Sequence, residues 1–170
     1  MSDLYISWDA YTKKIEQLAI KIHEDGYKFN QIVCIAKGGL RIGDVLCRLF
    51  NVPLAILSVE SYRGETNKTQ NQQGQFSFSR DLAKTTPNLG SHVLLVDDLA
   101  DSGKTLIKSI KWLEKYYGFY LEQKIRTAVL WQKSSSIYSP NYCVDFLKDS
   151  PWIHMPFEKY ELNNIKYFKV

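Results

Sequence analysis

The chain has 170 residues, of which 45% are hydrophobic and 24% are charged, and its formal net charge is +4. This length suits one domain, residues 1–170, and the composition is ordinary for a globular protein. The N-terminal residues lack the order of a signal peptide, and no apolar run approaches the roughly 20 residues that span a bilayer. Basic residues form no dense run, which argues against a nucleic-acid partner. The three cysteines (Cys34, Cys47, Cys143) are odd in number and lack zinc-type spacing, so we expect a cytoplasmic protein.

Hydrophobic patterning predicts the elements of the first third of the chain. Residues 8–24 carry apolar side chains at helical spacing and are followed by Gly26, so we expect a helix there. Residues 31–36 form a short apolar run typical of a buried strand. Residues 40–50 return to helical spacing, and residues 54–59 have the pattern of the next strand.

Residues 63–75 contain no apolar side chain, so burial cannot anchor them. A stretch of this length is unusual inside a compact domain and favours a functional lid. Residues 76–79 alternate between apolar and polar, as expected for a hairpin strand that returns from it. We therefore expect a mobile lid over about residues 62–80.

The second half continues the alternation of strands and helices. Residues 92–96 have the pattern of a buried strand, residues 97–103 of a polar turn, and residues 104–117 of a helix with one apolar face. Residues 125–131 and 142–147 have the pattern of further strands. This order predicts an α/β fold with a mostly parallel central sheet flanked by helices. In such sheets ligands bind beyond the carboxyl ends of the strands.

The turn after the 92–96 strand carries the most informative residues. Asp97 and Asp98 stand at the strand end, Asp101 follows within a turn, and residues 102–105 begin the next helix. Such a helix start binds phosphate through free N–H groups, whereas the acids would face ribose hydroxyls, a metal ion or a proton to be removed. Capping alone also explains a pair of aspartates at a strand end. A Walker loop would need glycine at position 98, and the Rossmann pattern is absent.

The string from Val93 to Thr105 resembles the signature of the type I phosphoribosyltransferases: an apolar run, two acids, two residues, Asp, then Ser/Thr-Gly-x-Thr. The resemblance implies that Asp97 and Asp98 hold the ribose hydroxyls with help from Mg2+. It implies that Asp101 is the general base for the attacking base nitrogen. The residues implied to wrap the 5-phosphate are Asp101, Ser102, Gly103, Lys104 and Thr105.

A second motif, Ala36-Lys37-Gly38-Gly39, follows the 31–36 strand. Two readings stay open: the glycines only permit a tight turn, or they let backbone N–H groups approach diphosphate oxygens with Lys37 as countercharge. The segment resembles the diphosphate loop of the purine branch of the family. That loop often carries a non-proline cis peptide, which we expect here at Lys37-Gly38. The sequence gives no reason to place Arg41 in the site rather than on the surface.

Ser61 and Tyr62 match the start of the family's flexible loop. The implied reaction passes through a ribosyl oxocarbenium ion, which water would trap. A lid that closes over bound substrate excludes that water.

The C-terminal third carries the residues that the resemblance assigns to the acceptor base. Lys133 resembles the residue of hypoxanthine-guanine and xanthine-guanine enzymes that bonds the purine 6-oxo group; a lone lysine after a strand is otherwise typical of a solvated surface. Trp152 and Ile153 resemble the pair in which an aromatic ring stacks on the purine and the next backbone carbonyl reads its exocyclic group. A core tryptophan is the alternative.

Glu158 aligns with an acid that approaches a second Mg2+ through water. The implied metal-site residues are Asp97, Asp98 and Glu158, and residues 133–161 would form a small C-terminal hood.

The resemblance implies a Mg2+-dependent purine-salvage enzyme that transfers phosphoribosyl from phosphoribosyl diphosphate to hypoxanthine, guanine or xanthine. Lys133 together with Trp152 argues against a pyrimidine acceptor. An alternative of another class is a regulator that uses the same fold to sense phosphoribosyl diphosphate or a nucleotide. We also expect a homodimer or homotetramer, because aromatic residues exceed what one small core needs (Trp112, Tyr116, Tyr117, Phe119, Tyr120).

Overall fold

The computed structural model describes residues 3–61, 76–121, 124–163 and 165. The elements follow in the order β1 (Leu4–Tyr5), α1 (Trp8–Asp25), β2 (Gln31–Ala36), α2 (Leu40–Phe50), β3 (Leu54–Ser61), β4 (Phe76–Phe78), β5 (Ala83–Lys84), β6 (Val93–Val96), β7 (Leu99–Ala100), α3 (Lys104–Leu121), β8 (Ile125–Lys133), β9 (Tyr142–Leu147), β10 (Ile153–His154) and α4 (Lys159–Leu162).

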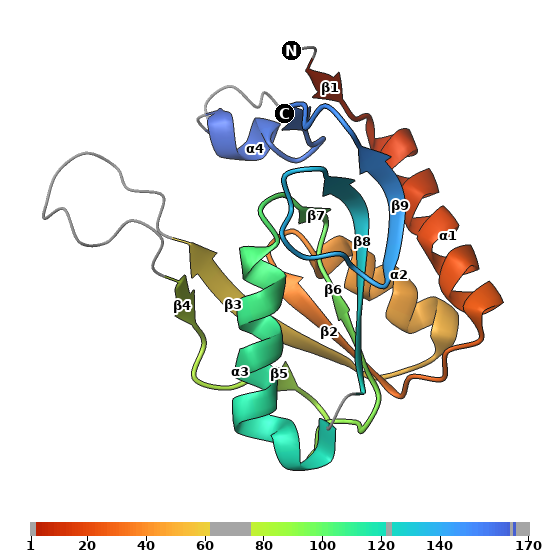
Figure 1. The fold of residues 1–170 in the computed structure, drawn as a ribbon, viewed down its shortest axis with the longest axis vertical. Helices are drawn as coiled ribbons and strands as arrows, with labels where there is room; N and C mark the ends of the chain where they lie inside the picture. The colour runs from red at the N-terminus through yellow and green to blue at the C-terminus, as the bar shows by residue number, and fades with distance from the viewer. Residues whose placement is uncertain (1–2, 62–75, 122–123, 164, 166–170) are drawn as a thin grey trace, which may run out of the picture.

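The central sheet has the strand order β4-β3-β2-β6-β8-β7, with β5 also on β3 and β9 also on β8. Strands β3, β2, β6, β8 and β9 run parallel, whereas β4 and β5 pair antiparallel to β3. Helices α1 and α2 cover one face of the sheet and α3 covers the other (Figure 1). This arrangement confirms the predicted α/β fold with a mostly parallel sheet.

The two faces of the sheet form two separate apolar cores. Ile32 and Leu94 pack toward α1 and α2, whereas their chain neighbours Val33 and Leu95 pack in the cluster beneath α3. Alternation of side chains along each strand produces this division. Both faces are covered, which explains why β2 and β6 are apolar runs rather than alternating sequences.

The ends of α1 follow from its capping residues. The Ser7 side chain accepts a hydrogen bond from the Ala10 N–H at 3.2 Å and caps the N-terminus. Gly26 ends the helix in the left-handed conformation with φ 73°. The observed helix, Trp8–Asp25, is one residue longer than predicted.

The first and the last strand meet at the edge of the sheet that carries the carboxyl ends of the parallel strands. There β1 pairs in parallel with β10, and α4 lies beside them (Figure 1). The predicted hairpin strand is confirmed as β4, which pairs antiparallel with β3. Most of the expected lid, residues 62–75, lies outside the described residues.

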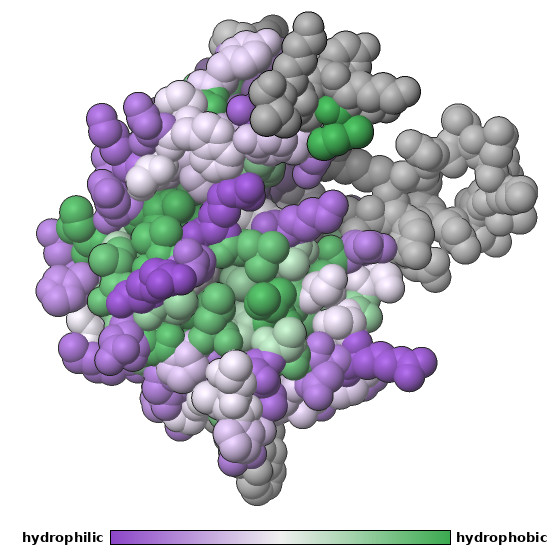
Figure 2. Space-filling model, turned by 180° about the vertical axis from the view of Figure 1, so that it is seen from behind, coloured by the Kyte–Doolittle hydropathy of each residue, from purple (hydrophilic) through white to green (hydrophobic). Residues whose placement is uncertain are grey.

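No helix in the described part of the chain is long and apolar enough to cross a membrane. Seen from behind, the molecule has a broad patch of apolar surface (Figure 2). The large apolar side chains exposed on α1 and α2 are Ile20 and Leu49.

Candidate active site

Three adjacent parallel strands bring the predicted motifs to one edge of the sheet. Lys37 follows β2, Asp97 follows β6, and Lys133 is the last residue of β8. Because β2, β6 and β8 are hydrogen-bonded neighbours running in the same direction, their carboxyl ends lie side by side. The segments that sequence analysis singled out therefore converge, as expected for an α/β sheet.

Asp97, which is buried, and Asp98, which is half-buried, form an acidic pair at the end of β6. The Asp97 carboxylate accepts a hydrogen bond from the Asp98 N–H at 3.0 Å, and Asp97 is only 7% exposed. Burial, reinforced by the charge of Asp98, raises the pKa of Asp97 well above its usual value, and burial likewise raises the pKa of Asp98. Hydroxyl donors or a bound cation would stabilise the two carboxylates, which repel each other and have lost water contacts.

The glycine loop packs directly against this acidic pair. A Cβ atom added to Gly38 would lie 2.4 Å from an Asp98 carboxylate oxygen, so no other residue fits without displacing that side chain. The Ala36-Lys37-Gly38-Gly39 loop and the acidic turn are therefore one structural unit. The cis peptide is Ala36–Lys37, and the prediction of Lys37–Gly38 is wrong by one residue. Neither bond precedes a proline, so the sequence carries no signal that separates the two.

The predicted phosphate loop turns at Gly103, which has a φ of +77°. A Cβ atom there would lie 2.6 Å from the Ser136 hydroxyl and 2.8 Å from the Tyr138 backbone nitrogen. The Ile137 N–H donates to the Ser102 carbonyl at 3.1 Å, so the loop rests on the turn that follows β8. Helix α3 begins at Lys104, and the N–H groups of its first turn suit a phosphate.

Lys133 and Asp101 form an ion pair across the site, with 3.2 Å between the Lys133 ammonium and an Asp101 carboxylate oxygen. Lys133 is only 7% exposed, so it is not the solvated surface lysine that the sequence left open as the alternative. The Lys133 ammonium also lies 5.8 Å from the centre of the Trp152 ring. Trp152 is 52% exposed, so it is not a core tryptophan, while Ile153 beside it is buried in β10.

Glu158 contacts a histidine of β10. Its carboxylate is 3.3 Å from Nδ1 of His154, whose Nε2 lies 3.0 Å from Asp3. Among the described residues, no three His, Cys, Asp or Glu side chains are grouped as a metal site. The role implied for Glu158, an approach to a second Mg2+ through water, needs no such direct group and stays a prediction.

Sequence reasoning missed two residues near the acidic pair, the buried Tyr11 and the exposed Arg41. Tyr11 is 1% exposed, and its hydroxyl has no hydrogen-bond partner among the described residues. Burial and the charge of Asp98 raise its pKa, and the charge of Arg41 opposes that rise. The spacing of Tyr11 on α1 indicates only a core position. The sole sequence signal for Arg41 is its place just after the double glycine.

The lid residues are described only in part. Ser61 is the last residue of β3 and pairs with Phe76 in the register of β3 and β4. Tyr62 lies outside the described residues. The start of the expected lid is therefore at the same edge of the sheet as the other motifs.

An acidic pair, a glycine loop and a helix N-terminus lie together at one sheet edge, as the resemblance to the phosphoribosyltransferases implies. Residues 7–161 match the family model described as the phosphoribosyl transferase domain. The chain therefore belongs to the phosphoribosyltransferase family, which confirms the resemblance seen in the acidic turn.

Solved structures share the fold over nearly the whole chain. The purine phosphoribosyltransferase of Pyrococcus horikoshii is 28% identical, with 92% of this chain and 95% of that chain covered and a TM-score of 0.71. The xanthine-guanine-hypoxanthine phosphoribosyltransferase of Helicobacter pylori is 22% identical, with 98% and 100% covered and a TM-score of 0.73. A hypothetical protein of Neisseria gonorrhoeae with bound ppGpp is 22% identical, with 92% and 89% covered and a TM-score of 0.67. At 22% identity the last two show the fold alone.

Proposed function

We propose that the protein transfers the 5-phosphoribosyl group of phosphoribosyl diphosphate to a 6-oxopurine (hypoxanthine, guanine or xanthine) in purine salvage. The observation that carries this proposal is the buried Lys133, which contacts both Asp101 and the face of the exposed Trp152. A purine that stacks on Trp152 presents its 6-oxo group to the Lys133 ammonium. The purine enzyme of Pyrococcus horikoshii among the similar structures supports the same acceptor class.

The donor binds across the two loops at the other side of the site. The 5-phosphate is held by residues 101–105 at the N-terminus of α3, where the helix dipole and free N–H groups favour an anion. The Asp97 and Asp98 carboxylates accept hydrogen bonds from the ribose hydroxyls. The diphosphate lies along Lys37, Gly38 and Gly39, where the close packing of Gly38 on Asp98 sets its distance from the ribose.

Mg2+ fits this site as an ion brought in with the substrate. The available protein donors are carboxylate oxygens, which this hard cation prefers, and Mg2+ is commonly held by one or two carboxylates together with substrate phosphates and water. Asp97 and Asp98, whose pKa values burial raises, would gain from a nearby cation. When bound, the ion neutralises charge on the leaving diphosphate.

The reaction exchanges one bond at C1 of the ribose. The bond from C1 to the diphosphate oxygen breaks, the bond from C1 to the purine nitrogen forms, and the nitrogen proton passes to the Asp101 carboxylate. Asp101 is half-exposed at the site and is paired with Lys133 before the base arrives. When Lys133 turns to the 6-oxo group, the Asp101 carboxylate is released from the ion pair and can take the purine proton.

A spectrophotometric turnover assay tests the proposal, with phosphoribosyl diphosphate and Mg2+ against hypoxanthine, guanine, xanthine, adenine, orotate and uracil in turn. We expect turnover with at least one 6-oxopurine, and in Asp101→Asn a larger loss of kcat than of donor binding. Equal loss of both would exclude the base role of Asp101. A protein that binds phosphoribosyl diphosphate but turns over none of the six bases would instead be a sensor.

We also propose that the chain assembles as a homodimer or homotetramer. Trp112 is buried and stacks on Phe78 with 6.2 Å between ring centres, and the Tyr117 hydroxyl donates to Asp81. Trp112 and Tyr117 are thus used within the chain, whereas Tyr116 of α3 is 55% exposed and Leu49 of α2 is 60% exposed. Molar mass from light scattering decides the state, and a value of one chain would exclude the proposal.

A further inference from the structure

Arg41 joins three parts of the molecule that are distant in sequence. It lies in the first turn of α2, directly after the Lys37-Gly38-Gly39-Leu40 stretch. Its guanidinium carbon lies 5.0 Å from the centre of the Trp8 ring and 5.2 Å from the centre of the Phe157 ring. Trp8 begins α1, and Phe157 belongs to the C-terminal segment, defined here as residues 151–162.

A third aromatic ring completes the contact. Tyr11 packs edge-on against Trp8 and Phe157, with ring centres 6.1 Å and 5.9 Å apart. The Tyr11 ring also lies 6.0 Å from that of Trp131, near the end of β8. Arg41 therefore caps a group of rings that extends from the surface to the buried edge of the site. A planar guanidinium suits this position because it stacks on aromatic faces, which an ammonium does less well.

Both ends of this contact are connected to residues of the site. The Gly39 N–H donates to the Ile35 carbonyl at 2.8 Å, and the Gly43 N–H donates to the Gly39 carbonyl at 2.8 Å, which fixes the start of α2 to the loop. On the other side, Phe157 is five residues from Trp152 and next to Glu158. A displacement of Phe157 would therefore move the acceptor side relative to the diphosphate loop.

We propose that Arg41 is a positioning residue: held between Trp8 and Phe157, it fixes the C-terminal segment against the diphosphate loop. In terms of the proposed function, on which this inference rests, Arg41 sets where the acceptor base lies relative to the leaving diphosphate. It does so without contacting the reacting atoms. Arg48 on the same helix has a different role, because it pairs with Asp44 at 2.9 Å and both are exposed.

The kinetic test compares Arg41→Met and Arg41→Lys with the matched control Arg48→Met. Two cation–π contacts at a partly exposed site correspond to a change of about 5- to 30-fold in an equilibrium constant. We expect KM for the purine to rise by up to this factor in Arg41→Met and less in Arg41→Lys. KM for phosphoribosyl diphosphate should stay within about twofold of wild type, since its own loops are unchanged. Arg48→Met should match wild type in both constants.

A second measurement separates this inference from the proposed function. Amide hydrogen exchange reports opening of the C-terminal segment through the Glu158 N–H, bonded to the Met155 carbonyl, and the Tyr160 N–H, bonded to the Phe157 carbonyl, both at 3.0 Å. We expect Arg41→Met to speed exchange at these amides and to leave those of β2 and β6 unchanged. Unchanged exchange, or equal rises of both KM values, would overturn the positioning role. If wild type turns over no base, the proposed function is wrong, and exchange alone still decides whether Arg41 holds the segment.

Discussion

The ion pair between Lys133 and Asp101 links the residue proposed to bind the acceptor to the residue proposed to take its proton. Lys133 is buried and Asp101 is half-exposed, so the lysine is the member that cannot find water as a substitute partner. A hydrogen bond to a charged group contributes about 1.5–3 kcal/mol, which corresponds to roughly 10- to 100-fold in an equilibrium constant.

From this we predict that Lys133→Met lowers kcat/KM for the 6-oxopurine by about 10- to 100-fold. Binding of phosphoribosyl diphosphate, measured by calorimetry, should change little because its loops remain intact. The control is Lys111→Met, which removes an exposed lysine of α3. A Lys133 variant with the purine kinetics of the control would remove Lys133 from the acceptor site.

At this scale the sequence could single out candidate residues but not the contacts between them. The acidic turn and the double glycine were predicted because each is a local pattern. The contact of Gly38 with Asp98 and the stacking of Arg41 on Trp8 and Phe157 join residues far apart in sequence. Such contacts depend on the folded arrangement, so a single sequence does not carry them.

Among the elements, helix α3 has a glycine just before its start and another near its end, and only the first position requires glycine. Gly103 has a positive φ, and an added Cβ would press on Ser136 and on the backbone of Tyr138. Gly118 lies within the helix, and an added Cβ there meets nothing within 4 Å. Replacement of glycine by alanine should therefore lower the stability of the protein at position 103 and raise it at position 118.

We predict that Gly103→Ala destabilises the protein by about 1–3 kcal/mol, because alanine is strained in the left-handed region and lacks space. Gly118→Ala should stabilise it by up to about 1 kcal/mol, because alanine favours the helix. Urea unfolding measures both values. Gly103→Ala should also weaken binding of the 5-phosphate, and an unchanged affinity would place that phosphate elsewhere.

Element prediction from sequence succeeded where an apolar run had clear ends. The bounds of β2, α2 and β9 agree with the predicted ranges, because polar residues or glycines flank each run. The pairs β1 with β10 and β7 with β8 were not predicted. A strand of two residues has no periodicity to detect, and its pairing is set only by the rest of the fold.

In the molecule as a whole, a second polar cluster lies at the opposite edge of the sheet from the site. Arg126, at the start of β8, donates to the Asp25 carboxylate and to the Tyr142 hydroxyl. The Tyr142 hydroxyl in turn donates to Asp25 at 2.6 Å. The end of α1 is thus joined to the starts of β8 and β9, on the side where the strands begin.

This cluster gives stability a defined dependence on pH. The hydrogen bond from Tyr142, with help from Arg126, lowers the pKa of Asp25 below its usual 3.8. A carboxylate with a lowered pKa contributes stability above the pKa of the unfolded chain, and the contribution is lost as pH falls through the folded value. Asp25→Asn should therefore lower Tm near neutral pH and flatten the fall of Tm with acidification below about pH 4.

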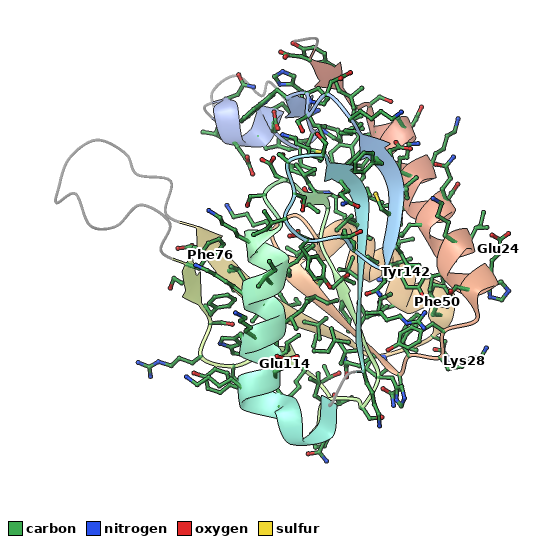
Figure 3. The ribbon with its side chains drawn as sticks, viewed as in Figure 1. Glu24, Lys28, Phe50, Phe76, Glu114 and Tyr142 are labelled. Atoms are coloured by element: carbon green, nitrogen blue, oxygen red, sulfur yellow. The ribbon has the colours of Figure 1, made fainter. Side chains whose placement is uncertain are left out.

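The control for this prediction is Glu24→Gln, which removes the neighbouring carboxylate at the same helix end. Glu24 points outward, away from Tyr142 at the start of β9 (Figure 3). Calorimetric scans between pH 2.5 and 7 should show the wild-type dependence in Glu24→Gln. Because the cluster and the site lie at opposite edges of the sheet, kcat/KM at a temperature well below Tm should be unchanged in Asp25→Asn. An acid dependence of Tm that Asp25→Asn leaves intact would show that other carboxylates determine it, and that the α1 contact contributes no pH-dependent stability.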